Sequence, residues 1–190
     1  ISGQDGYLLS KYLTSKNYIV LGLSTKKNKK KNIIKTDYSK NSLKKIIYNF
    51  NPDEIYHLAG ITNPSESWKN VEKNFIANFH ITMNLLEILK IKKKIKLFNA
   101  SSCEIFDESS KPLNENSKIF PKNPYGIAKS ASYFLTNAYR SKYKLFIVNG
   151  ILFNHVSDKS NKKYLLQYIL ESTKKIKQNK ITKIFIKDSR

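Results

Sequence analysis

The sequence predicts an α/β domain in which helices cover a parallel β-sheet. Short apolar runs alternate with longer segments whose apolar residues recur every three or four positions, as alternating strands and helices require. Turn signals such as Asn51-Pro52-Asp53 separate the two kinds of segment. A chain of 190 residues, 40% of them hydrophobic and 12% aromatic, is also long enough to bury one sizeable core.

The elements follow in a regular order along the chain. The apolar runs that read as strands are 18–23, 32–35, 54–58, 95–99 and 145–150. The helical patterns are 7–15, 39–49, 71–90 and 125–141. Beyond Gly150 the pattern changes, and we expect a helix from about 164 to 178 and a closing strand at 184–186.

The charge is strongly positive, with 35 Lys and Arg against 14 Asp and Glu, a net +21. Such a balance raises nucleic acid or an anionic membrane as partners. However, only Arg140 and Arg190 are arginines, and the lysine-rich run at 26–31 contains no aromatic side chain to stack on a base. We interpret the charge as a solvated basic surface and expect no specific nucleic acid and no membrane as partner.

The cysteines, histidines and apolar stretches of the chain argue against a disulfide-bonded, metal-binding or membrane-spanning protein. Cys103 is the single cysteine, so an internal disulfide is excluded. His57 and His80 have no carboxylate or cysteine at ligand spacing, and we expect no metal site. No apolar stretch approaches the roughly 20 residues of a membrane span, and no targeting pattern follows Ile1. We expect a cytoplasmic protein.

Two motifs carry chemistry. Gly3-Gln4-Asp5-Gly6 precedes a helical pattern, and a glycine-rich turn at a helix start lets backbone N–H groups approach a pyrophosphate. Tyr125 and Lys129 stand four residues apart on a predicted helix, hence on one face. A lysine ammonium beside a phenol favours the phenolate, which can then accept a proton near neutral pH.

The chain resembles the extended short-chain dehydrogenase/reductase family, and within it the GDP-mannose 4,6-dehydratase branch. The segments that carry the resemblance are Gly3 to Gly6, Pro52 to Gly60, Ser101-Ser102-Cys103-Glu104, Asn123-Pro124-Tyr125 with Lys129, and Asn149-Gly150-Ile151-Leu152-Phe153-Asn154-His155. The last segment is the most specific of them.

The resemblance implies a Rossmann-like, doubly wound parallel sheet. It further implies that the first strand precedes Ile1 and is missing here. Residues 1–150 would form an NADP-binding domain, incomplete at its N-terminus. Residues 151–190 would start a small C-terminal portion that binds the sugar nucleotide, also incomplete.

The same resemblance implies a lyase mechanism on GDP-mannose or a related nucleotide sugar. Tyr125 would take the proton of the sugar 4-hydroxyl as hydride leaves C4, with Lys129 assisting and Ser102 binding the same hydroxyl. Glu104 would remove the C5 proton and help water leave from C6. Asn154 would face the sugar diphosphate.

NADP is the expected cofactor, because the end of the strand predicted at 18–23, the second strand of the family's sheet, carries hydroxyls and ammonium groups from Gly22 to Lys27 and no acid that would hold the ribose of NAD. In the family's pattern Thr25 and Lys26 would meet the 2′-phosphate. The other contacts that the resemblance implies are Gly3, Gln4, Asp5 and Gly6, Asp37 and Tyr38, Leu58, Ala59 and Gly60, Lys129, His155 and Lys159, with Asn78 as a structural helix asparagine.

Two alternatives stay open. One is an epimerase or reductase for nucleotide sugars on the same scaffold, which would not need Glu104. The other is a non-catalytic protein that binds a dinucleotide or a polyanion through its positive charge. The resemblance also implies a homodimer or homotetramer of the full-length protein, paired through the helices at 71–90 and 125–141.

Overall fold

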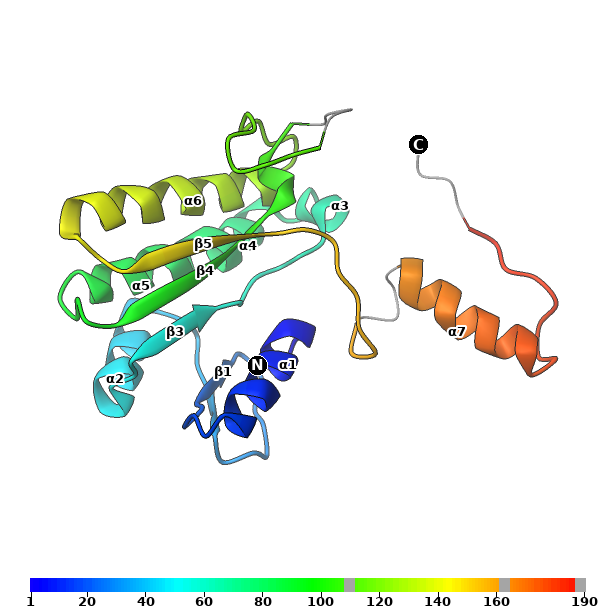
Figure 1. The fold of residues 1–190 in the computed structure, drawn as a ribbon, viewed down its shortest axis with the longest axis horizontal. Coiled ribbons are helices and arrows are strands. Elements are labelled where there is room, and N and C mark those ends of the chain that lie inside the picture. Colours follow the sequence, from blue (N-terminus) through cyan, green and yellow to red (C-terminus); the bar gives the residue numbers. More distant parts are fainter. Residues whose placement is uncertain (108–111, 161–164, 187–190) are drawn as a thin grey trace. The chain divides into compact units, whose positions relative to one another are not determined.

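The computed structural model describes residues 1–107, 112–160 and 165–186. Its contacts divide the chain into two compact units, Leu21–Phe153 and a smaller one made of Ile1–Val20 and Asn154–Arg190. Figure 1 follows the chain through both.

The larger unit contains two parallel sheets, which confirms the predicted α/β class. In one, β1 (Gly22–Ser24) pairs with β2 (Ile33–Lys35). In the other, β4 (Lys96–Ser102) lies between β3 (Glu54–His57) and β5 (Ile147–Leu152). Because all strands of this sheet are parallel, their carboxyl ends meet at one edge.

Helices cover one face of the β3-β4-β5 sheet (Figure 1). Leu43 and Ile47 of α2 (Lys40–Phe50) pack with the apolar side of α5 (Ile81–Leu89). These residues, together with Leu97 of β4, form the core. The helix α6 (Pro124–Tyr143) packs against the same sheet and against α5, with Tyr139 and Tyr143 at the border of the core.

The predicted helix at 71–90 is a continuous helical segment of mixed kind. It begins as α4 (Val71–Phe75), widens into a π-helix, η1 (Ile76–His80), and continues as α5. The short α3 (Pro64–Ser67), capped by the side chain of Asn63, precedes it and was not predicted. Its four residues are too few for an apolar period to appear.

The smaller unit contains α1 (Gln4–Ser15) and α7 (Leu165–Lys177). The helix predicted from about 164 is therefore confirmed except at Tyr164, which lies outside the described residues. The strand predicted at 184–186 is wrong, because this segment forms no strand pairing with any residue that the structure describes and Phe185 is 75% exposed. The strand predicted at 18–23 forms only from Gly22, since Tyr18 and Ile19 are exposed and lie outside the sheet.

Among the described helices, none combines the length and the apolar character that crossing a membrane requires.

Candidate functional site

The candidate site begins where β4 ends. Ser102 is the last residue of this buried strand, and its Oγ accepts a hydrogen bond of 3.2 Å from the backbone N–H of Glu104. The hydroxyl thereby caps a single 3₁₀ turn, η2 (Cys103–Ile105), which turns the chain away from the sheet. Glu104 is thus carried on a short turn at the carboxyl edge of the sheet, and its side chain is partly buried.

The N-terminus of α6 supplies the second half of the site. Asn123 caps the helix, since its Oδ1 accepts a 2.8 Å hydrogen bond from the N–H of Gly126. Pro124 occupies the first turn, where a missing N–H costs nothing. Tyr125 and Lys129 follow on this helix, and both are buried.

Gly126 brings the two halves together. A Cβ atom at this position would overlap the backbone carbonyl oxygen of Glu104, and it would also press on Pro121. Backbone cannot yield as a flexible side chain can, so only glycine lets η2 lie this close to α6. The contact places Glu104 beside the turn of helix that carries Tyr125.

Lys129 is held inside the site. Its Nζ donates a 2.8 Å hydrogen bond to the carbonyl of Ala100 and lies 5.8 Å from the centre of the Tyr125 ring. Burial lowers the pKa of Lys129 to about 8. The ammonium form therefore predominates at neutral pH.

His57, at the end of β3, lies close enough to Lys129 for the positive charge of the ammonium group to act on its ring. Burial, and then the positive charge of Lys129, lower the pKa of His57 to about 3. The ring is neutral at physiological pH and shares a 3.1 Å hydrogen bond with Thr82 Oγ1. We assign His57 a structural role.

The segment after β3 approaches the same lysine. Leu58, Ala59 and Gly60, which were predicted to contact the cofactor, follow the strand directly. A Cβ on Gly60 would overlap the side-chain oxygen of Asn78 and would lie 3.7 Å from Lys129 Nζ. Asn78 is itself fixed by two 3.1 Å bonds from its Nδ2, to the carbonyls of Ile61 and Asn74.

The residues predicted to hold the adenosine end lie after β1 and β2. Thr25 and Lys26 follow β1, and the N–H of Lys26 bonds to Ser24 Oγ at 3.1 Å. After β2, the Asp37 carboxylate accepts from the N–H of Ser39 at 2.9 Å, which together with nearby serine hydroxyls lowers the pKa of Asp37. Tyr38 packs against the core, and burial raises its pKa.

The other predicted binding residues belong to the smaller unit. Gly3 precedes α1, which has no side-chain cap there, and a Cβ on Gly3 would meet no atom within 4 Å. A Cβ on Gly6, by contrast, would strike the backbone of Ile1.

Within this unit the loop before α7 meets the start of α1. His155 Nε2 lies 2.8 Å from Asp5 Oδ1, and Ser160 donates to Gln4. Lys159 pairs with Asp158 at 3.0 Å, which raises the pKa of Lys159. Asn154, the predicted substrate contact, is exposed.

The structure thus brings Ser102, Glu104, Tyr125 and Lys129 together at one edge of one unit. One residue with a direct contact in this group had no role assigned from the sequence: Asn123 Nδ2 donates a 2.8 Å hydrogen bond to Glu104 Oε2. Asn at the N-cap followed by Pro is a common start of a helix, but a contact over 19 positions has no local signal.

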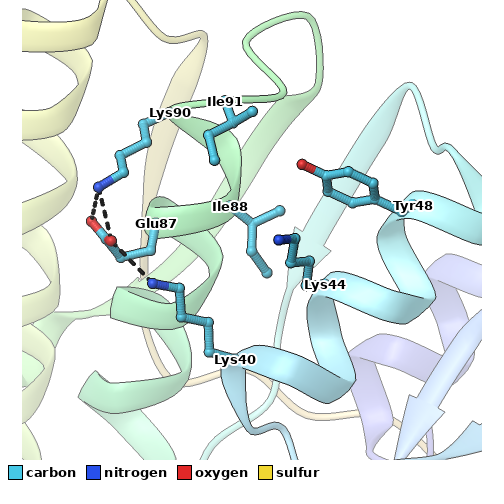
Figure 2. A pocket seen from close by; sticks show the side chains of 7 residues that line it. All are labelled: Lys40, Lys44, Tyr48, Glu87, Ile88, Lys90 and Ile91. Carbon is cyan, nitrogen blue, oxygen red and sulfur yellow. Dashed lines mark hydrogen bonds and ion pairs between the residues drawn. The ribbon is translucent and has the colours of Figure 1, made fainter.

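A separate pocket lies between α2 and α5 (Figure 2). Glu87 lies on its wall with Lys40 and Lys90 at 3.3 and 2.8 Å, so its charge is already neutralised by the protein. None of the predicted site residues lines this pocket. No group of three His, Cys, Asp or Glu side chains suited to a metal ion occurs within residues 1–107, 112–160 and 165–186.

Comparison with known proteins decides the family. The family model described as GDP-mannose 4,6 dehydratase matches residues 1–189. The chain belongs to this family. GDP-mannose 4,6 dehydratase 2 of Arabidopsis thaliana is 29% identical over 211 residues, which cover 98% of this chain and 57% of the relative. The chain therefore spans little more than half the length of this member of the GDP-mannose 4,6 dehydratase family.

Solved structures agree on the fold. UDP-glucuronic acid 4-epimerase from Bacillus cereus, in complex with UDP-glucuronic acid and NAD, matches 92% of this chain and 61% of its own with a TM-score of 0.81 at 22% identity. RMD from Pseudomonas aeruginosa, complexed with NADPH, matches 94% and 60% with a TM-score of 0.75 at 21% identity. At these identities the match establishes the Rossmann-like fold of this GDP-mannose 4,6 dehydratase family member.

Proposed function

We propose that the protein is a nucleotide-sugar 4,6-dehydratase that acts on GDP-mannose with bound NADP. The observation that carries the proposal is the carboxylate of Glu104 held beside the start of α6, where Tyr125 and Lys129 lie. A base for a carbon-bound proton is what elimination of water requires and epimerisation at C4 does not. Membership of the GDP-mannose 4,6 dehydratase family supports the same assignment.

The residues divide the proton transfers between them. Tyr125, with Lys129 beside it, accepts the proton of the sugar 4-hydroxyl, to which Ser102 also hydrogen-bonds. Glu104 accepts the proton from C5, and the electron pair of that bond forms a C5–C6 double bond as hydroxide leaves C6 and takes up the proton from Glu104 to become water. Each transfer of this kind contributes on the order of 10²- to 10⁴-fold to a rate.

The chain has groups that fit a nicotinamide dinucleotide. Gly3 leaves open space before the uncapped N-terminus of α1, where a pyrophosphate is stabilised by backbone N–H groups. Thr25 and Lys26 favour NADP over NAD, because no acid occupies the end of β1. When bound there, the cofactor would supply a hydride acceptor for C4 and a hydride donor for C6.

The test uses the purified full-length protein with GDP-mannose and a catalytic amount of NADP⁺, followed by mass spectrometry of the sugar nucleotide. We expect loss of one water without net reduction of NADP⁺. Glu104→Gln should lower the rate of water loss at least about a hundredfold while hydride exchange at C4 continues.

Glu115→Gln is the matched control, because Glu115 is exposed on a turn and bonds to nothing in the site. A wild-type protein that leaves GDP-mannose unchanged while binding NADP⁺ would refute the dehydratase proposal. Normal water loss by Glu104→Gln would remove Glu104 from the mechanism.

A further inference from the structure

Asn123 makes a pair of hydrogen bonds that joins the proposed base to the helix of the proposed acid–base pair. Its Oδ1 accepts from the N–H of Gly126 and its Nδ2 donates to Glu104 Oε2, each at 2.8 Å. The orientation of the amide is fixed by these partners, because a backbone N–H can only donate and a carboxylate oxygen can only accept.

The two oxygens of the Glu104 carboxylate therefore differ. Oε2 is occupied by Asn123, whereas Oε1 has no hydrogen-bond partner among the residues that the structure describes. A carboxylate oxygen that already accepts a hydrogen bond is the weaker proton acceptor. The free oxygen, Oε1, is the one left to take a proton.

The backbone keeps this arrangement rigid. The carbonyl of Asn123 accepts a 3.0 Å hydrogen bond from the N–H of Ile127, which is the first hydrogen bond of α6. The carbonyl of Ile105, one residue after Glu104, accepts a 2.9 Å hydrogen bond from the N–H of Phe120. Gly126 lies directly against the Glu104 carbonyl. Asn123 thus stands between two segments whose separation is set by backbone contacts.

We propose that Asn123 is a positioning residue for proton abstraction from the substrate: it holds Glu104 Oε2 at the N-terminus of α6 and leaves Oε1 to accept the proton. The inference rests on the proposed dehydratase function. It predicts that the reactive oxygen is presented at a fixed place relative to Tyr125, so that the 4-keto group and the C5 base act on one bound sugar.

Two variants separate positioning from helix capping. Asn123→Ser keeps an oxygen that caps α6 but is too short to reach Glu104. Asn123→Asp also keeps the cap, but removes the donor and places a second negative charge beside the Glu104 carboxylate. Both should melt within a few degrees of the wild type.

The kinetic readout is exchange of the C5 hydrogen with solvent and the rate of water loss. We expect Asn123→Ser to lower both by about tenfold with little change in KM. Asn123→Asp should move the acid limb of the pH–rate profile to higher pH, because like charges favour the protonated carboxyl. Wild-type rates and an unshifted profile in both variants would overturn the proposal.

A measurement independent of activity distinguishes this proposal from the dehydratase assignment. NMR titration of glutamate carboxyl carbons, with Glu104→Gln to assign the signal, should show a higher titration midpoint for Glu104 in Asn123→Asp than in the wild type. This shift is expected even if GDP-mannose is not the substrate, and its absence would refute the contact itself.

Discussion

At the scale of single residues, the site depends on one buried cation. Among the residues that the structure describes, Lys129 pairs with no carboxylate, and its ammonium group donates a hydrogen bond to the carbonyl of Ala100. Burial lowers the pKa of Lys129 to about 8, because the charged form is less stable in the folded protein than in water, and this difference is a cost to the free energy of folding. The proposed proton transfer by Tyr125 would use this charge, which the folded state holds at a cost in stability.

We predict that Lys129→Met abolishes activity and yet is more stable than the wild type at pH 7, by on the order of 1–3 kcal/mol. The pKa of a lysine in the unfolded chain is about 10.4. Because the folded-state pKa is lower, the penalty is fully present below pH 8 and is relieved as pH rises from about 8 to 10.4.

The measurement is urea unfolding of both proteins between pH 7 and 10.4, in which the advantage of the variant should shrink with rising pH. Lys142→Met, at an exposed position of the same helix, is the control and should not alter this pH dependence. A variant less stable than the wild type at every pH would contradict the prediction.

At the scale of elements, Glu87 joins three helices. Its carboxylate, on α5, accepts hydrogen bonds from Lys90 at the end of the same helix and from Lys40 of α2 (Figure 2). It also accepts a 2.6 Å hydrogen bond from the hydroxyl of Tyr139 on α6. The bonds from Lys90 and then Tyr139 lower the pKa of Glu87 to about 2, and the bond to Glu87 raises the pKa of Tyr139 to about 12. The packing of the three helices is therefore stabilised by the hydrogen bonds and ion pairs of Glu87 as well as by the apolar core.

We predict that Glu87→Gln destabilises the protein by about 1 kcal/mol at pH 7, a modest amount because the carboxylate is 24% exposed and partly screened by solvent. The folded-state pKa lies below the unfolded value of about 4.3, so this stabilisation is present above pH 4.3 and is lost as pH falls towards 2.

Acid unfolding followed by circular dichroism would measure it, and the two proteins should converge near pH 2. Glu171→Gln, which removes only the exposed 3.4 Å pair with Lys174, should behave as the wild type. A constant difference between wild type and Glu87→Gln from pH 7 to 2 would show that Glu87 acts through shape rather than charge.

The elements also show what a sequence can predict. The positions of β1 to β5 were predicted within a few residues, because a buried parallel strand is a short apolar run whatever surrounds it. The π-helix at Ile76–His80 was missed, since one extra residue in a helical turn changes the spacing of apolar residues by a single position. In the site, Tyr125 and Lys129 share a local motif, whereas the bond from Asn123 to Glu104 joins distant segments and has none.

At the scale of the whole molecule, α6 presents apolar side chains to solvent. Ile127 and Phe134 lie seven residues apart, hence on one face, and are 44% and 55% exposed. Such a face is typical of an interface, and the family resemblance predicts a homodimer formed through this helix.

We predict that Phe134→Glu shifts the full-length protein to monomers in light scattering, because the charge would be buried without a partner between subunits. Ile19→Glu, at an 88% exposed position outside both of the helices expected to pair, is the control and should leave the mass unchanged. An unchanged mass for Phe134→Glu would mean that α6 does not pair two copies.

The π-helix η1 determines where related chains can differ in length within this helical segment. A π turn holds one residue more than an α turn. The residues of α5 after η1 therefore face the core as they would if one residue were removed from η1 and the whole segment were a regular α-helix. Related chains that lack one residue between Ile76 and His80 should therefore keep Leu85 and Leu89 in the core through a regular helix. Length variation in this helix is then tolerated at η1, whereas a deletion within α5 would rotate its apolar side away from the sheet.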